Sequence, residues 1–240
     1  MELFFIRHAQ SENNALAARN AVNEVRTHDP ELTALGQQQA ARLAEFLAQQ
    51  HPEAHTAPYD PQNRRGITLT HLYASLMVRA VNTGTALAQR LGLPLTAWVD
   101  WHEEGGLFLE ESPGHFVGRP GNGRSYFEKR YPGFKLPETL TDAGWWTHAL
   151  EPHEDRPRRA RRALAELLER HGGTDDHVGI VSHGGFYTHL VAALMDVQPP
   201  YKLAHLLNNA SISRIVLTPS GSYVVYQNRC EYLPTELITT

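Results

Sequence analysis

The chain has 240 residues, of which 41% are hydrophobic, with a formal net charge of −4 and one cysteine, Cys230. This size suffices for one substantial core, so we predict a single domain over 1–240. The acidic balance argues against a nucleic-acid partner, and a lone cysteine excludes an internal disulfide. No apolar run reaches the roughly 18 residues of a membrane span, and the N-terminus lacks a secretory signal. These features predict a cytoplasmic protein without a membrane partner.

Short apolar runs alternate with amphipathic stretches along most of the chain. The predicted strands cover residues 2–6, 71–74, 95–99, 178–181, 212–217 and 223–226. The predicted helices begin at Thr33, near Ala80, at Asp155 and after His183. Residues 9–32 are mostly polar and predict a loop or irregular helix. Strands that alternate with helices predict an α/β protein, a three-layer α/β/α sandwich with a mostly parallel central sheet.

The stretch from about Gly105 to Glu154 interrupts this alternation. It is rich in glycine, proline and aromatic residues and shows weak periodicity, so we predict an inserted cap that partly covers a site. Four histidines lie in or just before this segment, namely His102, His115, His148 and His153. They lack the tight spacing of metal ligands, so no metal site is predicted for them. The next helix carries an arginine run interpreted as solvent-facing, namely Arg156, Arg158, Arg159, Arg161 and Arg162.

Chemistry-bearing side chains follow three of the predicted strands: Arg7-His8, the segment from Ser75 to Arg79, and Ser182-His183. Because ligands bind beyond the carboxyl ends of strands in an open α/β sheet, we expect the three groups to share one crevice. Two guanidinium groups and two imidazoles suit a phosphoryl group, whose oxygens they bind and whose transition state they stabilise without a metal. A neutral His8 imidazole is able to attack phosphorus and form a phosphohistidine.

The leaving oxygen of such a reaction needs a proton donor. Two carboxyl groups, Glu103 and Glu104, follow the third predicted strand and are both candidates for a general acid that later activates water. Proximity of two like charges favours the protonated form of one of them.

Five segments, taken in order, resemble one known family. The sequence RHAQSENN at 7–14 resembles the Arg-His-Gly signature of the histidine phosphatase superfamily, also called phosphoglycerate mutase-like. Its other motifs are matched by LTALGQQQA at 32–40, YASLMVRA at 73–80, VSHGG at 181–185 and NASI at 209–212. Two departures stand out, because Ala9 replaces the usual glycine and Leu76 the usual proline.

The resemblance implies a phosphoglycerate mutase-like sandwich and a role for each matching position. His8 is the implied phosphorylated nucleophile, and Glu103, in a His-Glu-x-Gly-Gly segment, is the implied acid, with Glu104 as the alternative. The residues implied to bind the phosphoryl group or the substrate are Arg7, Arg79, His183, Asn14, Thr33 and Gly184. The implied partner is a small-molecule phosphomonoester, with no cofactor and no metal. The sequence is also compatible with a homodimer.

Two enzymatic outcomes remain open at this point. A phosphatase passes the phosphoryl group from phospho-His8 to water, whereas a cofactor-dependent phosphoglycerate mutase returns it to the substrate. The segment after Glu103 does not resemble the longer mutase signature, which favours a metal-independent phosphoric monoester hydrolase. A non-catalytic binding protein is disfavoured because the nucleophile is present, and a serine hydrolase because the chain has no Gly-x-Ser-x-Gly elbow.

Overall fold

A computed structural model describes residues 1–20, 26–54, 56, 59–202 and 204–240, and its centre is a six-stranded sheet. The strand order is β3-β2-β6-β1-β7-β8. The strands are β1 (Glu2–Arg7), β2 (His71–Ala74), β3 (Leu95–Ala97), β6 (His177–Ser182), β7 (Ile212–Thr218) and β8 (Gly221–Arg229). The first four of these run parallel, and β7 is antiparallel to both β1 and β8. The predicted mostly parallel sheet with a late hairpin is confirmed.

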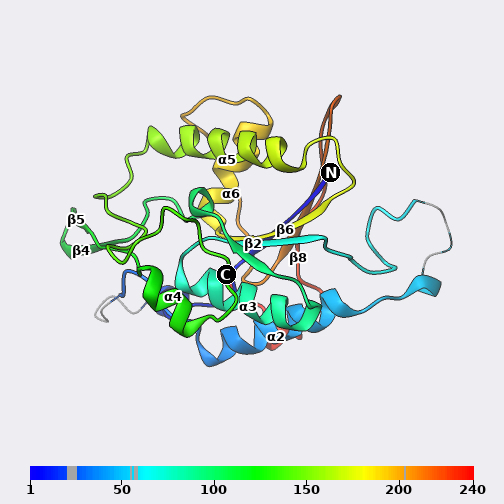
Figure 1. Cartoon of the computed structure of the whole chain (residues 1–240), viewed down its shortest axis with the longest axis horizontal. Helices are drawn as coiled ribbons and strands as arrows, with labels where there is room; N and C mark the ends of the chain where they lie inside the picture. Colours follow the sequence, from blue (N-terminus) through cyan, green and yellow to red (C-terminus); the bar gives the residue numbers. More distant parts are fainter. Residues whose placement is uncertain (21–25, 55, 57–58, 203) are drawn as a thin grey trace.

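Helices cover both faces of the sheet. Figure 1 shows α5 (Asp155–His171) and α6 (Gly184–Leu194) on one side, and α2 (Ala34–Ala48) and α3 (Val78–Leu91) on the other. Strand β1 supplies both cores, because successive side chains point to opposite faces. Leu3 and Phe5 pack in the cluster that contains α5 and α6, whereas Phe4 and Ile6 pack in the cluster that contains α2 and α3. The predicted three-layer sandwich is therefore the observed fold.

Helix ends follow local capping chemistry. The Thr33 hydroxyl accepts a hydrogen bond from the Gly36 N–H at the start of α2, and Gly92 ends α3 with φ of 67°. A short helix, α1 (Glu12–Ala18), begins at a capping box formed by Ser11 and Asn14. It lies in the stretch predicted as loop or irregular helix, of which residues 21–25 lie outside the described residues.

The segment 105–154 leaves the sheet and forms small elements of its own. A hairpin joins β4 (Phe108–Ser112) to β5 (His115–Gly118), and α4 (Arg124–Arg130) follows. In Figure 1 these elements lie together at the left of the sheet, whereas the N-terminus lies at its right. Short 3-10 helices lie elsewhere in the chain, at Pro52–Ala54, Val99–Trp101 and Thr235–Leu237.

Two predictions need correction. The strand expected over 95–99 ends at Ala97, because the chain turns into a 3-10 helix at Val99. The solvent-facing interpretation of the arginine run is wrong for Arg156 and Arg159, which are 9% and 3% exposed. Their spacing of three places both on the inward face of α5, since residues i and i+3 share one side of a helix. Across the described ranges no helix is long and apolar enough to cross a membrane.

Candidate active site

The three predicted groups meet at the carboxyl ends of neighbouring strands. Arg7 at the end of β1 pairs in register with Ser182 of β6, and Ala74 of β2 pairs with Val181. The ring centroids of His8 and His183 lie 5.0 Å apart. Arg79, in the first turn of α3, donates from Nε to His8 Nε2 over 3.1 Å. The expected convergence of these side chains is thus present in the structure.

The hydrogen bonds of His8 define its tautomer. Nδ1 lies 2.7 Å from the backbone carbonyl oxygen of Ala9, which only accepts, so Nδ1 carries the proton. Nε2 then holds a lone pair, and it accepts the hydrogen bond from Arg79. A neutral imidazole with this tautomer presents Nε2 as a nucleophile.

Burial and positive charge keep both histidines neutral. Burial lowers the pKa of His8 well below 6.5, and the charges of Arg79 and Arg7 lower it further. Burial, followed by the charge of Arg79, also lowers the pKa of His183 well below that value. Desolvation disfavours the charged form of a base, and nearby cations act in the same direction. At neutral pH the His8 lone pair is therefore available.

Two buried nitrogens beside His8 have no hydrogen-bond partner within the described part of the chain. They are Arg7 Nε and His183 Nδ1. The other ends of both side chains are held, since His183 Nε2 lies 2.7 Å from Ser75 Oγ and an Arg7 Nη1–H donates to the Leu207 carbonyl. Buried polar atoms are nearly always satisfied, so these two atoms suit an anionic ligand such as a phosphoryl group.

The two candidate acids have different surroundings. Glu103 interacts electrostatically with both Arg7 and Arg79, and its carboxylate lies at the N-terminus of α6. Its Oε1 accepts from the Glu104 and Phe186 N–H groups at 2.9 and 2.8 Å. Within the described residues, Oε2 accepts a single, longer bond, from the Gly185 N–H at 3.3 Å. Oε2 is thus the freer oxygen for exchanging a proton.

Glu104 points to a different set of partners. Its Oε2 accepts from Arg156 Nη1 at 2.9 Å and lies 3.1 Å from His189 Nε2. The hydrogen bond with His189, followed by the charge of Arg156, lowers the pKa of Glu104 despite partial burial. A carboxylate held in the ionised form by two basic groups is a poor proton donor, which weakens the case for Glu104 as the acid.

The remaining predicted binding residues differ in their surroundings. A Cβ added at Gly184 would lie 3.4 Å from Arg7 Nε, so this residue borders the guanidinium. Asn14 Oδ1 accepts from Ser11 N at 3.1 Å and from Asn209 Nδ2 at 3.3 Å. The Thr33 hydroxyl lies 2.7 Å from Gln10 Oε1, in addition to its capping bond.

Both departures from the family pattern fit the local structure. Ala9 is fully buried, is not among the residues with positive φ, and donates its N–H to Thr83 Oγ1 at 3.1 Å. A glycine is therefore not required at this position. Leu76 is also fully buried, and the turn that it occupies leaves Arg79 within hydrogen-bond distance of His8.

Asp29 was not predicted, although it lies next to the site. Its carboxylate is 4.0 Å from Arg79 Nη1 and accepts hydrogen bonds from Val78 N–H and Asn122 Nδ2 at 2.9 and 3.4 Å. Burial raises the pKa of Asp29 to about 7, and the Arg79 charge opposes this shift. An acidic residue in a polar loop carries no sequence signal that separates this buried position from an exposed one.

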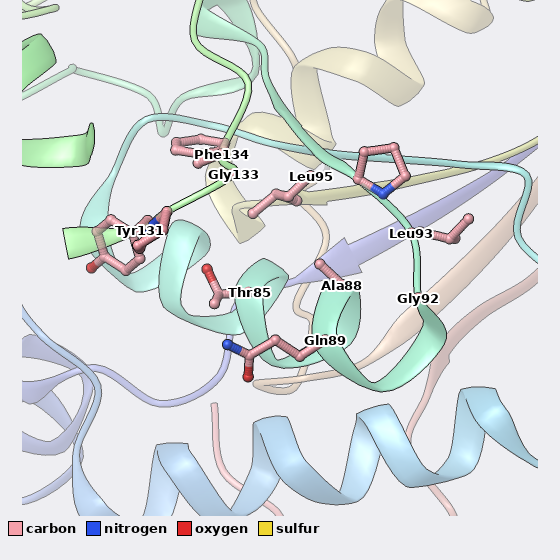
Figure 2. A pocket seen from close by; sticks show the side chains of 11 residues that line it. Thr85, Ala88, Gln89, Gly92, Leu93, Leu95, Tyr131, Gly133 and Phe134 are labelled. Atoms are coloured by element: carbon pink, nitrogen blue, oxygen red, sulfur yellow. The ribbon is translucent and has the colours of Figure 1, made fainter. Parts of the chain in front are cut away.

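A pocket elsewhere is not part of this site. Figure 2 shows that it lies beside the C-terminal half of α3, where Thr85, Leu93, Tyr131 and Phe134 line it. None of its lining residues belongs to the predicted site.

Comparison with known proteins places the chain in a family. A family model described as histidine phosphatase superfamily (branch 1) matches residues 3–60 and 61–229. The protein therefore belongs to the histidine phosphatase superfamily, as the sequence motifs predicted, a family of metal-independent phosphoryl hydrolases that react through a phosphohistidine.

Several of the relatives that match are named as phosphatases. A glucosyl-3-phosphoglycerate phosphatase of Mycolicibacterium vanbaalenii is 28% identical over 198 residues, which cover 80% of this chain and 73% of that protein. The structure of an alpha-ribazole phosphatase from Shigella flexneri superposes with a TM-score of 0.59 at 16% identity, covering 95% and 96% of the two chains. A phosphoserine phosphatase from Entamoeba histolytica gives 0.57 at 17% identity, covering 97% and 99%. The predicted phosphatase branch is confirmed, and the two structures confirm the fold.

Proposed function

We propose that His8 is the nucleophile of a phosphomonoester hydrolase, that Arg7, Arg79 and His183 bind the phosphoryl group, and that Glu103 is the general acid and base. One observation carries this proposal. The Nδ1–H of His8 is fixed on a backbone carbonyl, which leaves the Nε2 lone pair beside a guanidinium. A lone pair so placed is suited to in-line attack on a phosphorus atom whose oxygens the guanidinium binds.

The first half of the reaction forms a covalent intermediate. His8 Nε2 attacks phosphorus, the bond between phosphorus and the ester oxygen breaks, and that oxygen takes a proton from Glu103 Oε2. Arg7 and Arg79 stabilise the charge on the equatorial oxygens, and His183 Nδ1 supplies a further contact. In the second half, Glu103 takes a proton from water, the hydroxide attacks phosphorus, and the bond from phosphorus to Nε2 breaks. This releases inorganic phosphate and restores neutral His8.

The segment 105–154 is proposed as a cap over this site within a single domain of residues 1–240. Its contacts support that role, because it touches loops on two sides of the site. Asn122 donates to Asp29, and the rings of Trp145 and Trp146 lie 5.6 and 5.0 Å from that of His102, next to Glu103. Such a cap would exclude water before attack and select the ester.

The substrate is proposed to be a small-molecule phosphomonoester. Relatives named for glucosyl-3-phosphoglycerate, phosphoserine and alpha-ribazole provide the first compounds for a screen. Roles for Asn14, Thr33 and Gly184 in holding the substrate stay predictions, as do the cytoplasmic location and the homodimer.

A phosphate-release screen over metabolite phosphomonoesters tests the function. We expect at least one ester to release phosphate, with His8→Ala abolishing that release. Isomerisation of 3-phosphoglycerate is assayed in parallel. Rapid isomerisation with negligible phosphate release would identify a mutase and overturn the hydrolase proposal.

A further inference from the structure

The loop that carries Glu103 is held by a buried arginine on α5. Arg159 donates from Nη1 to the carbonyl oxygens of Asp100 and His102, both at 2.8 Å, and from Nη2 to that of Glu103 at 3.5 Å. These contacts reach the backbone directly before and at the proposed acid. The side chain of Arg159 is 4% exposed, so water does not compete for the bonds.

The same guanidinium forms a bidentate ion pair with Glu151. Arg159 Nε lies 2.6 Å from Glu151 Oε1, and Nη2 lies 2.8 Å from Oε2. Together with the three carbonyl contacts, these bonds use all five N–H donors of the arginine. A lysine has one compact ammonium group and is unable to reproduce this planar arrangement.

Glu151 joins the other side of the loop to this arginine. Its Oε2 accepts from the Gly105 N–H at 3.1 Å, and its own N–H donates to the Gly105 carbonyl at 3.0 Å. Arg159 thus binds the backbone at Asp100, His102 and Glu103, and Glu151 binds it at Gly105, so the loop is anchored on both sides of the acid. We call the Arg159–Glu151 pair the bracket. Gly105, two residues after the acid, has φ of 86°, a left-handed conformation that favours glycine.

We propose that Arg159, with Glu151, is a positioning residue that sets the location of the Glu103 carboxylate relative to His8. Arg159 does not touch the reacting atoms and acts through the backbone of Glu103. A second contact supports the coupling, because the guanidinium lies 4.8 Å from the ring centroid of Phe186, whose N–H binds Glu103 Oε1. The inference rests on the proposed role of Glu103 as the proton donor.

The test compares two esters that differ in their need for that proton. An alkyl phosphomonoester requires protonation of its leaving oxygen, whereas 2,4-dinitrophenyl phosphate releases a stable anion. For Arg159→Lys we expect kcat/KM on the alkyl ester to fall about 10- to 100-fold, because a shift of about 1 Å in a catalytic group has such an effect. On the dinitrophenyl ester the expected change is within about twofold.

Arg158→Lys is the matched control. Arg158 lies on the same helix in an ion pair with Asp155, and its side chain is 69% exposed. This variant should leave both rates unchanged. Rates are measured at a temperature at which circular dichroism shows every variant to be folded. If Arg159→Lys does not fold, Glu151→Gln tests the same bracket while keeping an oxygen for the Gly105 N–H, and the same selective loss is expected.

Glu103→Gln separates failure of this inference from failure of the proposed function. If Glu103→Gln fails to discriminate between the two esters, the assignment of the acid is wrong. A second outcome is that Glu103→Gln lowers kcat/KM selectively on the alkyl ester, but the folded Arg159→Lys or Glu151→Gln variant does not. If that variant lowers kcat/KM equally on both esters, or on neither ester, Arg159 does not position the acid and the inference is overturned. A double variant adds a further check, since Arg159→Lys should cost little on the alkyl ester once Glu103 is already glutamine.

Discussion

Two histidine clusters lie at opposite ends of the central strands and differ in how their nitrogens are partnered. At the carboxyl ends, buried His183 Nδ1 has no partner among the described residues, and His8 Nε2 contacts only a guanidinium. At the amino ends, His171 is equally buried, but its Nε2 lies 3.0 Å from the Tyr73 hydroxyl and its Nδ1 2.9 Å from Asp176 Oδ2. Burial alone therefore does not mark a reactive histidine. The partners differ, because His8 and His183 lie beside the fixed charge of Arg79, whereas the nitrogens of His171 are bonded to a hydroxyl and a carboxylate.

The distinction between the two clusters fails if replacement of His8 and replacement of His171 have the same effect on activity. His8→Asn should reduce the rate of phosphate release at least about 10³-fold, because it removes the nucleophile. His171→Asn should leave kcat within about twofold, since His171 lies away from the chemistry. Initial rates on the best ester from the screen measure both, and equal losses would contradict the distinction.

A second prediction concerns the two adjacent carboxylates. Glu103→Gln should lower kcat/KM on an alkyl phosphomonoester about 10²-fold, the lower end of the contribution of a general acid. Glu104→Gln should change it by less than about threefold, because Glu104 is bound to Arg156 and His189 away from the phosphoryl site. The reverse order of effects would reassign the acid to Glu104.

A third prediction follows from the raised pKa of Asp29. The pKa of Asp29 is about 7 in the folded protein and 3.8 for an ordinary aspartate, so between these limits the folded protein holds a proton that the unfolded chain has released. The wild-type free energy of unfolding should therefore fall relative to that of Asp29→Asn as pH rises from 4 to 7. We expect a relative loss of roughly 3 kcal/mol from urea titrations across this window. An unchanged difference between the two proteins would show that Asp29 is ionised throughout.

The smallest expected effect is on stability at the amino-end cluster. His171→Phe removes both hydrogen bonds of the imidazole, so the Tyr73 hydroxyl and the Asp176 carboxylate each lose a hydrogen-bond partner. We expect the free energy of unfolding to fall by about 1–2 kcal/mol, with activity retained. His115→Phe, at an exposed hairpin position, is the control and should have little effect. A selective loss of activity in His171→Phe would couple this cluster to catalysis.

The sequence was sufficient for the features set by local pattern and chain topology. The apolar run before Arg7 and the alternation of strands with helices predicted a parallel sheet, and strand-end placement then predicted that His8, Arg79 and His183 meet. Family motifs supplied the likeness to histidine phosphatases, which the family model confirms. These inferences succeeded because strand direction alone places residues at one edge of a sheet.

Contacts between distant segments were not predictable in this way. The burial of Arg159 depends on Glu151 and on three backbone carbonyls of another loop. Helical spacing places Arg159 on the inward face of α5, but it does not show what the guanidinium binds there. Asp29 likewise becomes a buried group only where α3 and the 105–154 segment close over it. Such features depend on tertiary packing, which periodicity does not encode.

The most direct test of the account is the identification of the phosphorylated atom. The enzyme is mixed with a ³²P-labelled phosphomonoester, quenched in alkali within the first turnover, digested and analysed by mass spectrometry and phosphoamino-acid chromatography. We predict phosphohistidine at Nε2 of His8, formed and lost at rates that match turnover, and none in His8→Asn. A label on any other residue, or full turnover by His8→Asn without a covalent intermediate, would contradict the central claim.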